Sequence, residues 1–488
     1  MTLAPDAAYR VLQAHDARFD GRLFVGVTST RVYCRPVCRV RLPRRENCRF
    51  FGNAASAERD GFRPCLRCRP ELAPGLALVD SPTVLAQHAA RMLVRAAHDG
   101  DDVALPAIAA RLGVTDRHLR RIFLAAHGVT PIDYLTTQRL LLAKQLLTDT
   151  GLTVASVALA SGFGSQRRFN AAFAERYRLS PTALRRSQRG SSLAPQHTLA
   201  GPTLRLAYRP PYDIDGVVGF FAARGVAGVE AADCAQHTLR RTLAFMHQGR
   251  LVSGWLAWRY LPARHEVEVV VSPSLASALG AVAQRLRQAL DLDADPASID
   301  SALAALAGPA GTRVPNGLDG FETAVRVVLG QQVSVAAART LTRRLVETLG
   351  EPIVTPFADL SRLFPSAERI ANAAPEAIGR LGIVRQRVGA LQALAREVHA
   401  GRLCLHRGAP LAATIEALHA LPGIGDWSAQ LIAMRALAWP DAFPASDIGV
   451  LNALGTRDAK AVAELAQAWR PWRSYAVMRL WHSLETGT

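Results

Sequence analysis

The stretch Leu421-Pro-Gly-Ile-Gly-Asp-Trp-Ser-Ala-Gln-Leu431 places two glycines directly before a helix-forming segment. This is a helix-hairpin-helix signature, in which a tight glycine turn exposes backbone N–H groups at the start of a helix. Such N–H groups bind a DNA phosphate, so Gly423 and Gly425 are predicted DNA contacts. By itself the hairpin indicates DNA binding and not catalysis.

A candidate catalytic carboxylate follows the hairpin. Asp447 stands in Phe443-Pro-Ala-Ser-Asp-Ile448, 22 residues after Gly425 (447 − 425). A single Asp after a turn is usually the N-cap of a helix, and that interpretation is the stronger one for the residue taken alone. The role of Asp447 therefore depends on the sequence around it.

Length and charge indicate a multidomain protein with a polyanionic partner. The chain has 488 residues, of which 49% are hydrophobic, and its net charge is +18 with a pI near 10.6. All but two of its 58 basic residues are arginines, whose planar forks suit phosphates and base edges. No leader and no membrane-spanning stretch is evident, which predicts a cytoplasmic, nucleoid-associated protein without a membrane partner.

Composition shifts divide the chain into four domains, mainly α-helical. We expect a small zinc-bound α/β domain over residues 1–75, an all-α tandem helix-turn-helix domain over 81–187 and a breaker-rich linker over 188–202. An α+β domain, resembling the TATA-binding protein in its layers, is expected over 203–315, and an all-α helix-hairpin-helix core over 316–486.

Two cysteine pairs predict a metal site near the N-terminus. Cys34-Arg-Pro-Val-Cys38 and Cys65-Leu-Arg-Cys68 have spacings that let each pair hold one edge of a tetrahedral zinc ion. From spacing alone, a purely structural zinc is the more common outcome. Cys48 departs from the pattern and is interpreted as a spare buried thiol. No cysteine follows Cys404, so no iron-sulfur cluster is expected.

The cysteine pairs lie in a longer similarity. Tyr33-Cys-Arg-Pro-Val-Cys-Arg39, Arg45-Glu-Asn47 and Gly61-Phe-Arg-Pro-Cys-Leu-Arg-Cys68 closely resemble the N-terminal domain of the Ada adaptive-response family, over roughly residues 5–72. The resemblance implies that Cys34 irreversibly accepts a methyl group from a DNA methylphosphotriester, with Cys34, Cys38, Cys65 and Cys68 holding one zinc ion. It also implies DNA contacts by Thr30, Arg39, Arg41 and Arg63.

Charge around these cysteines agrees with a phosphate-facing surface. Residues 1–70 hold fourteen Arg, no Lys and six Asp or Glu, a difference of +8 (14 − 6). A zinc-bound thiolate stays deprotonated at neutral pH and, being partly neutralised, can approach a phosphate.

Two helix-turn-helix units follow in tandem. Val103-Ala-Leu-Pro-Ala-Ile-Ala-Ala-Arg-Leu-Gly-Val114 leads into an Arg-bearing helix, and Thr153-Val-Ala-Ser-Val-Ala-Leu-Ala-Ser-Gly-Phe163 begins a second copy, with turn glycines at 113 and 162. A lone helical hairpin is more often mere packing, whereas a tandem pair favours DNA binding. Two recognition helices on one frame can enter successive major-groove segments about 34 Å apart, which predicts a monomeric reader.

The tandem unit, with Gly-Phe-Gly-Ser-Gln at 162–166 and Leu179-Ser-Pro-Thr182, resembles the AraC-type DNA-binding domain. This implies a transcription activator that binds promoters as double-stranded DNA and contacts RNA polymerase. The side chains expected to reach bases or phosphates are Arg117, Arg120, Arg167 and Arg168.

The C-terminal half resembles the AlkA-type 3-methyladenine DNA glycosylases over residues 203–486. The similarity is carried by Tyr208-Arg-Pro-Pro-Tyr212, Leu329-Gly-Gln-Gln-Val-Ser-Val335, the hairpin and Trp469-Arg-Pro-Trp-Arg-Ser-Tyr-Ala476. It implies that Asp447 is the essential carboxylate and that Trp427 and Trp472 line the pocket of the alkylated base. Core packing is the alternative role for both tryptophans.

Three positions refine this resemblance. Gln332 stands where an apolar wedge can replace the flipped base, and Leu431 stands where an aromatic pocket residue can occur. Trp427 occupies the position that carries Lys in related glycosylases with lyase activity, so we expect a monofunctional hydrolase that leaves an abasic site.

The leading hypothesis is a bifunctional protein that senses methylated DNA backbone, activates repair genes and excises alkylated bases. The alternative is a regulator whose C-terminal half is only a DNA-binding arm. An O6-methylguanine methyltransferase is not expected, because the sequence contains no Pro-Cys-His-Arg motif.

Overall fold

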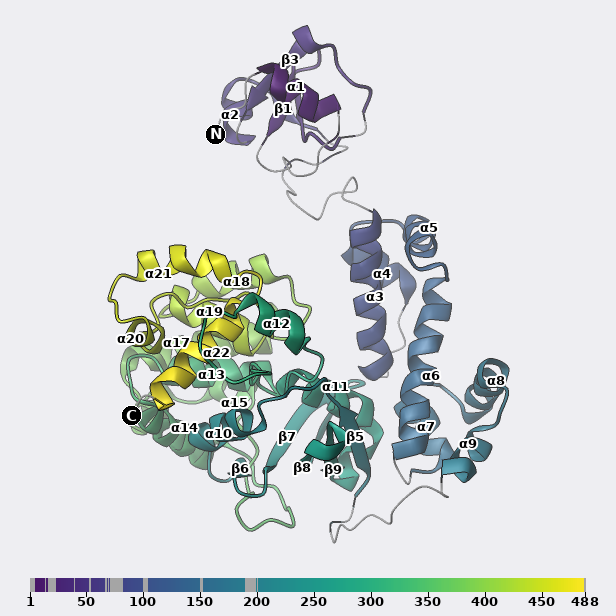
Figure 1. Ribbon diagram of the computed structural model, residues 1–488, viewed down its shortest axis with the longest axis vertical. Helices are drawn as coiled ribbons and strands as arrows, with labels where there is room; N and C mark the ends of the chain where they lie inside the picture. Colours follow the sequence, from purple (N-terminus) through teal and green to yellow (C-terminus); the bar gives the residue numbers. More distant parts are fainter. Residues whose placement is uncertain are drawn as a thin grey trace. The chain divides into compact units, whose positions relative to one another are not determined.

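The computed structural model describes residues 5–13, 15, 23–38, 40–51, 54–65, 68, 70, 82–99, 104–149, 152–188, 199 and 201–486. They form two compact units, the second made of residues 98–100 and 140–488 (Figure 1). The expected fold class, multidomain and mainly α, is confirmed. Most of the expected linker 188–202, together with Arg39, lies outside the described residues. Within those residues, no helix combines the length and apolar character needed to cross a membrane.

The N-terminal domain is a four-stranded sheet with the order β3-β1-β2-β4. Strand β1 pairs antiparallel with β2 and β3, and β2 pairs in parallel with β4. Gly26 lies under two aromatic rings, because a Cβ there would come within 2.8 Å of Phe51 and 2.9 Å of Phe62. The elements are α1 (Pro5–Gln13), β1 (Phe24–Val27), β2 (Val32–Cys34), β3 (Cys48–Phe51), α2 (Ala54–Arg59) and β4 (Arg63–Pro64).

The first helix-turn-helix has the predicted glycine turn. Gly113 adopts a φ of +68°, a left-handed conformation that suits glycine, and Thr115 then caps the recognition helix by accepting a hydrogen bond from the His118 N–H. Leu119, Ile122 and Phe123 bury the inner face of that helix. The elements are α3 (Pro82–Asp99), α4 (Leu105–Arg111), α5 (Asp116–His127) and α6 (Pro131–Asp149).

The second helix-turn-helix repeats these devices. Gly162 has a φ of +78°, and the Ser165 hydroxyl caps α8 by accepting from the Arg168 N–H. Phe169 and Phe173 are the fully buried residues on the inner face of α8. Both recognition helices therefore begin at a Ser or Thr cap, after the glycine turn that the sequence predicts. The elements are α7 (Val154–Ala160), α8 (Gln166–Tyr177) and α9 (Pro181–Gln188).

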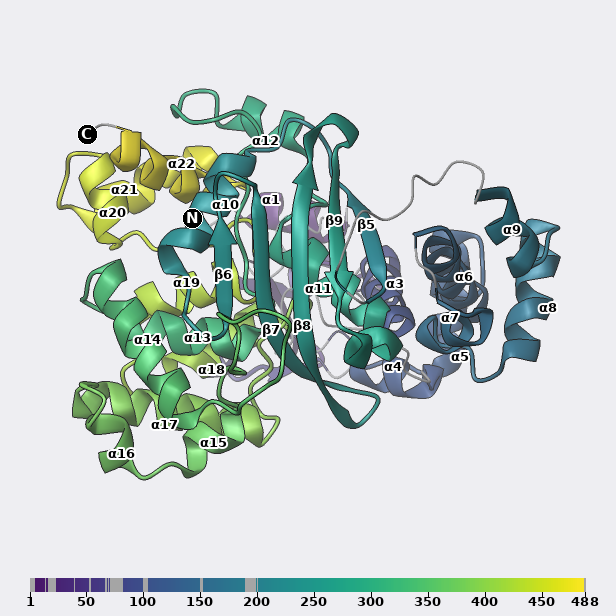
Figure 2. The same cartoon turned by 90° about the horizontal axis from the view of Figure 1, so that it is seen from below.

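An antiparallel five-stranded sheet with the order β5-β9-β8-β7-β6 forms the α+β domain (Figure 2). Helices α10 and α11 pack against it, which agrees with the expected α+β class. Its strands are β5 (Thr203–Ala207), β6 (Glu230–Asp233), β7 (Thr238–His247), β8 (Arg250–Leu261) and β9 (Glu266–Val271). Its helices are α10 (Ile214–Arg224), the 3-10 helix η5 (Pro273–Ala278), α11 (Leu279–Ala289) and α12 (Pro296–Ala302).

The remaining residues form an all-α domain around one large apolar core, as predicted. The helices are α13 (Gly320–Leu329), α14 (Val335–Leu349), α15 (Ala367–Asn372), α16 (Pro375–Gly379), α17 (Arg385–His399), α18 (Leu411–His419), α19 (Asp426–Arg435), α20 (Ile448–Ala453), α21 (Ala459–Leu465) and α22 (Arg473–Thr486).

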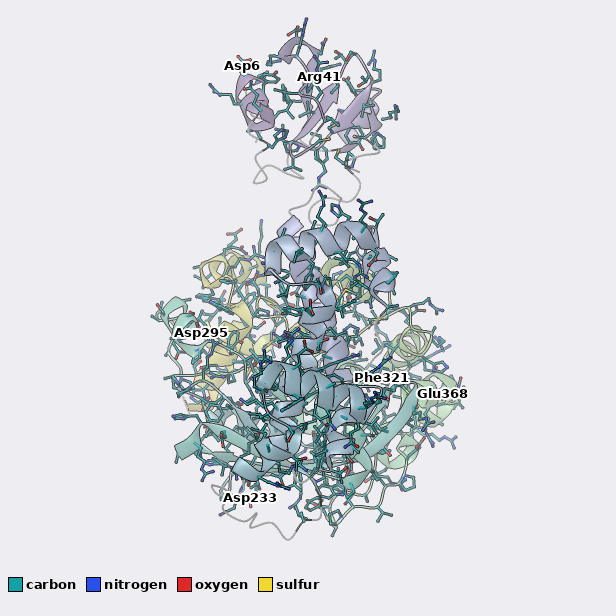
Figure 3. The ribbon with its side chains drawn as sticks, turned by 90° about the vertical axis from the view of Figure 1, so that its right-hand side faces the viewer. Asp6, Arg41, Asp233, Asp295, Phe321 and Glu368 are labelled. Carbon is teal, nitrogen blue, oxygen red and sulfur yellow. The ribbon has the colours of Figure 1, made fainter. Side chains whose placement is uncertain are left out.

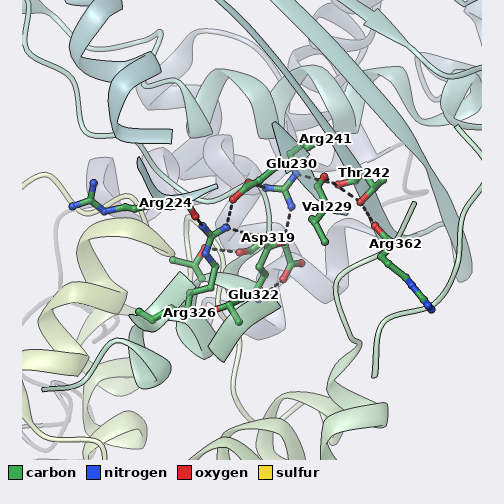
Figure 4. A network of polar contacts seen from close by, with 12 residues as sticks. Arg224, Val229, Glu230, Arg241, Thr242, Asp319, Glu322, Arg326 and Arg362 are labelled. Atoms are coloured by element: carbon green, nitrogen blue, oxygen red, sulfur yellow. Dashed lines mark hydrogen bonds and ion pairs between the residues drawn. The ribbon is translucent and has the colours of Figure 1, made fainter. Parts of the chain in front are cut away.

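Buried ion pairs join the sheet domain to the all-α domain (Figure 4). Arg241 of β7 donates to Glu322 of α13 at 2.6 Å, and Arg326 of α13 donates to Glu230 of β6 at 2.6 Å. Breaking one partner of such a pair would leave an uncompensated buried charge, which costs several kcal/mol. The network therefore fixes how the two domains meet around the site described next.

Candidate functional site

The glycine hairpin lies between α18 and α19 and has the predicted geometry. Gly423 has a φ of +75°, and Gly425 is the exposed N-cap residue of α19. The Gln331 side chain, from the loop between α13 and α14, donates to the Gly423 carbonyl at 2.8 Å and to the Ser428 hydroxyl at 2.9 Å. The loop that carries Gln332 is thus tied directly to the hairpin.

Asp447 is both a helix cap and the centre of a hydrogen-bond cluster. Its Oδ1 accepts from the Val450 N–H at 3.1 Å, as an N-cap of α20 should. The Trp427 indole donates to Oδ2 at 2.9 Å, and the Trp481 indole donates to Oδ1 at 2.9 Å. A carboxylate offers about four lone-pair sites, so three bonds leave one acceptor position, on Oδ2.

Trp481 connects this carboxylate to the sheet domain. Its ring stacks on Phe220 of α10, with centroids 6.4 Å apart and planes 14° from parallel. Two guanidinium groups also lie close to the Phe220 ring, with Arg224 at 3.9 Å and Arg435 at 4.6 Å from its centroid. Burial, with Arg224 and Arg326 nearby, lowers the pKa of Arg435 to about 9, so it remains charged at neutral pH.

The two predicted pocket tryptophans have different partners in the structure. Trp427 bonds Asp447, whereas the ring of Trp472 packs edge-on against Tyr475, with centroids 5.8 Å apart. Among the described residues, the second indole on the carboxylate is that of Trp481, which the sequence reasoning missed. Its signal was weak, because a tryptophan in a C-terminal helix is typical of core packing.

Of the other two predicted positions in this half, one is exposed and one is buried. Gln332 is exposed and has a φ of +51°, so it stands at the tip of the loop between α13 and α14. Leu431 is buried, 8% exposed, and belongs to the core of the all-α domain.

The four predicted ligand cysteines come together. The Sγ atoms of Cys34, Cys38, Cys65 and Cys68 all lie within 4.8 Å of one another. A tetrahedron of sulfurs around zinc has edges of about 3.8 Å, so this donor set and its spacing fit one zinc ion. Cys48 lies outside the cluster, where its buried thiol donates to the Arg44 carbonyl at 3.3 Å.

The four sulfurs are not equivalent. Cys68 Sγ accepts from the Arg35 N–H at 3.5 Å. Hydrogen bonds with the thiols of Cys34 and Cys68 are the main cause that lowers the pKa of Cys38, and a backbone hydrogen bond from Val40 lowers it further. Among the described residues, no such backbone donor meets Cys34, whose neighbours Cys38 and Cys68, together with burial, raise its pKa.

The predicted DNA contacts of the N-terminal domain are exposed where they are described. Thr30, Arg41 and Arg63 are exposed, and Figure 3 labels Arg41 on this domain. Arg63 is the first residue of β4, which leads to Cys65 and pairs in parallel with β2, the strand that ends at Cys34.

The predicted contacts of the helix-turn-helix units are exposed as well. Arg117, Arg167 and Arg168 occupy the first turns of the recognition helices, where base edges are reached. Arg120 is also exposed, but its Nε donates to Asp116 one turn earlier at 2.9 Å. Arg120 would have to leave that surface ion pair to reach DNA, at little cost.

Comparison with known proteins covers the whole chain. A probable bifunctional transcriptional activator/DNA repair enzyme AlkA of Mycobacterium tuberculosis is 38% identical over 491 residues, spanning 98% of this chain and 96% of that relative. This chain belongs to the same Ada–AlkA fusion family. Four domain models match it as well: the metal binding domain of Ada (residues 7–71), a helix-turn-helix domain (108–187), the AlkA N-terminal domain (203–319) and the HhH-GPD superfamily of base excision DNA repair proteins (325–473).

Two shorter relatives show how this fusion family is composed. DNA-3-methyladenine glycosylase 2 of Escherichia coli is 32% identical over 57% of this chain and 96% of its own length. The bifunctional transcriptional activator/DNA repair enzyme Ada of Escherichia coli is 38% identical over 26% of this chain and 34% of its own length. The chain is thus a DNA repair and transcription protein that joins Ada-type and AlkA-type parts.

Proposed function

We propose that the C-terminal half hydrolyses the N-glycosidic bond of alkylated bases such as 3-methyladenine. The observation that carries this is the Asp447 carboxylate, which two indoles and a backbone N–H hold in place with one acceptor position open. A carboxylate that only capped a helix would not need both indoles.

The open acceptor position of Asp447 can hold the water that attacks the sugar. An N-alkylated purine is cationic and leaves readily, and the face of the Trp427 ring can attract it once it is flipped out of the duplex. As the bond from the sugar to the base breaks, Asp447 stabilises the oxocarbenium-like sugar. A water held by Oδ2 then adds to the sugar and gives its proton to the Asp447 carboxylate, which later releases it to solvent, so the products are an abasic site and a neutral free base.

The reaction is monofunctional, because position 427 carries Trp in place of a Schiff-base lysine. Incubation with a duplex containing 3-methyladenine should give an intact abasic strand that breaks only on alkali treatment. Borohydride should trap no protein–DNA adduct. A trapped adduct would contradict hydrolysis. Lesion binding without base release would instead support the alternative that the C-terminal half only binds DNA.

We further propose that Cys34 irreversibly accepts a methyl group from a DNA methylphosphotriester. Cys34, Cys38, Cys65 and Cys68 would hold one zinc ion, which when bound keeps all four thiols deprotonated at neutral pH. The Cys34 sulfur attacks the methyl carbon, an S–CH3 bond forms, the O–CH3 bond breaks, and the phosphodiester leaves as an anion. Among the described residues, backbone N–H groups donate to the sulfurs of Cys68 and Cys38 and none donates to that of Cys34, which favours Cys34 because hydrogen bonds withdraw electron density from a thiolate.

The test is a single-turnover transfer from DNA carrying labelled methylphosphotriesters, with the acceptor located by peptide mass spectrometry. One methyl per chain on Cys34 is expected, and Cys34→Ala should accept none. A label on Cys65 or Cys68 would overturn the assignment.

Methylation would convert the protein into an activator of repair genes. The exposed arginines of α5 and α8 would read promoter DNA in successive major-groove segments, and the bound protein would contact RNA polymerase. We propose that it acts as a cytoplasmic, nucleoid-associated monomer. Footprinting of upstream regions with methylated and unmethylated protein tests this: protection that is independent of methylation would contradict a switch.

A further inference from the structure

The second helix-turn-helix shares a hydrophobic core with the sheet domain. Helix α7 lies against η5, and buried residues of α6, α7 and α8 belong to the same apolar cluster as Leu204 of β5 and Leu275 of η5. Burial of this kind is typical of domains that form one body and not of units joined only by a linker.

The sequence of α6 is suited to two partners. Leu140, Leu142, Ala143, Leu146 and Leu147 are all buried, whereas Leu141 and Lys144 are exposed. At 100° per residue these buried positions span about 160° of the helix, wider than the stripe of about 100° that a single apolar neighbour requires. Leu142 lies at the end of this arc that is next to Gln145.

Gln145 itself reaches the edge of the sheet. Strand β5 is an edge strand of the sheet. Its register directs the backbone N–H and C=O groups of Leu204, Leu206 and Tyr208 towards β9, so the carbonyls of Arg205 and Ala207 face outwards. The Gln145 amide donates to the Arg205 carbonyl at 3.3 Å, and Arg287 donates to that of Ala207 at 3.4 Å. Gln145 of the helix-turn-helix and Arg287 of α11 therefore share the cover of an edge that would otherwise be open to pairing.

The all-α domain meets the opposite edge of the same sheet. Beside β6 and β7, Arg240 donates to Asp359 at 2.7 Å and Thr242 donates to the Arg362 carbonyl at 2.6 Å. Strands β5 and β6 are separated by four inter-strand steps, which amounts to about 19 Å. The sheet thus stands between the helix-turn-helix and the all-α domain.

Both DNA-binding surfaces remain open in this arrangement. Arg167 and Arg168 of α8 are exposed on one side of the sheet, and Gly423 and Gly425 of the hairpin are exposed in the domain on the other. In Figure 2, helix α8 lies on one side of the sheet, and α18 and α19, which flank the hairpin, lie on the other.

From this arrangement we infer that the sheet domain is a spacer that lets one molecule hold two duplexes at once. The second helix-turn-helix binds promoter DNA while the hairpin binds a separate lesion-containing duplex. This inference rests on the proposed function, because it needs each surface to bind DNA.

The test uses the full chain as Asp447→Asn, so that lesion DNA is not turned over. One probe is a lesion-free duplex selected from a random pool by its affinity for the chain, immobilised on beads. The other is a fluorescent duplex with a tetrahydrofuran abasic analogue. We expect the beads to capture about one fluorescent duplex per chain, and sedimentation to show a complex of one chain with two duplexes.

Two variants assign the surfaces. Arg167→Ala/Arg168→Ala should lose only the selected duplex. Gly425→Asp should lose only the lesion duplex, because position 425 has an ordinary extended backbone and open space, so the aspartate fits but repels a phosphate. If each duplex binds alone but displaces the other, the inference is wrong and the proposed function stands. If either duplex fails to bind alone, both are wrong.

A second measurement examines the joint between α6 and β5. A protease site placed within residues 190–197 allows the intact chain to be cut after folding. The two fragments should co-elute in gel filtration at micromolar concentration, and Leu142→Asp should separate them. If the fragments separate on cleavage even when Leu142 is unchanged, α6 is not held to β5, and the inference that the sheet domain is a spacer is wrong.

Discussion

At the residue scale, Asp447 carries the chemistry. We expect Asp447→Asn to lower 3-methyladenine release by at least about a hundredfold, because it removes the charge that stabilises the transition state. An asparagine can still cap α20 through its oxygen, but its amide would then face the Trp427 N–H, donor against donor. The measurement is single-turnover base release at saturating protein.

The control for Asp447→Asn is lesion binding. The Asn variant should hold a tetrahydrofuran duplex within a few fold of the wild type, which separates lost chemistry from lost folding. Turnover at the wild-type rate would show that Asp447 is only a helix cap.

The two tryptophans give a sharper comparison. Trp481→Phe keeps a ring on Phe220 but removes the N–H bonded to Asp447, and a hydrogen bond to a charged group contributes about 1.5–3 kcal/mol. Base release should therefore fall by about tenfold or more. Trp472→Phe is the matched control and should stay near the wild-type rate. The reverse pattern would restore Trp472 to the pocket, as the sequence alone predicts.

Cys34 belongs to this scale because one methyl group changes one charge. Four thiolates around a divalent cation carry a formal −2, and a thioether at Cys34 leaves −1. Less repulsion from phosphate should tighten promoter binding by about 1–3 kcal/mol, the usual size of an allosteric coupling. The measurement is promoter affinity at several salt concentrations before and after methylation, with Cys34→Ala as a control. Equal affinities at every salt concentration would exclude an electrostatic switch.

Residue-level prediction succeeded where spacing constrains geometry. Cys34-x-x-x-Cys38 and Cys65-x-x-Cys68 converge because each pair closes a short turn, and the glycines of the hairpin have one compatible backbone shape. Trp481 was missed because its contact with Asp447 joins α22 to the start of α20, a pairing that no local pattern encodes.

At the element scale, the start of α20 leaves no room for a side chain at Gly449. A Cβ there would lie 2.9 Å from the Trp481 ring and 3.0 Å from Asp447 Oδ1. Gly449→Ala should therefore displace the indole, lower base release by about tenfold and cost about 1–3 kcal/mol of stability through overpacking.

The matched control for that change is Gly379→Ala at the end of α16, where an added Cβ meets nothing within 4 Å. This variant should keep both stability and base release. An active Gly449→Ala would mean that Trp481 can be shifted without consequence for Asp447.

Helix-turn-helix elements were predictable in detail because their signals are local. A glycine in the turn and a Ser or Thr cap each act within one turn of helix, and both copies show them. The docking of α6 onto β5 was not predicted, because the apolar run of α6 indicates burial without naming the partner.

At the scale of the whole molecule, stability should depend on Asp291, which joins the end of α11 to α22. Burial raises the pKa of Asp291 to about 6, although a hydrogen bond from Tyr475 opposes the rise. Because the unfolded value is near 4, the folded state favours the protonated form. This contribution is complete below about pH 4 and is lost as pH rises through about 6, at most about 3 kcal/mol.

Asp291→Asn should remove this dependence while keeping the bond from Tyr475, and asparagine also tolerates the φ of +50° at this position. Thermal unfolding of both proteins between pH 4 and pH 7 provides the measurement. The midpoint of the wild type should fall relative to that of the variant as pH rises. A difference between the two unfolding midpoints that stays constant with pH would contradict this role of Asp291.

The covered edge of β5 has a consequence for how such genes evolve. A glycosylase that stands alone must protect that edge by its own means, whereas here Gln145 of the regulator shares the task with Arg287 of the glycosylase half. Once substitutions on β5 came to rely on that cover, separating the two genes again would release a glycosylase prone to self-association. Lineages carrying this fusion should therefore lose it rarely, and should inherit promoter reader and repair enzyme as a single heritable trait.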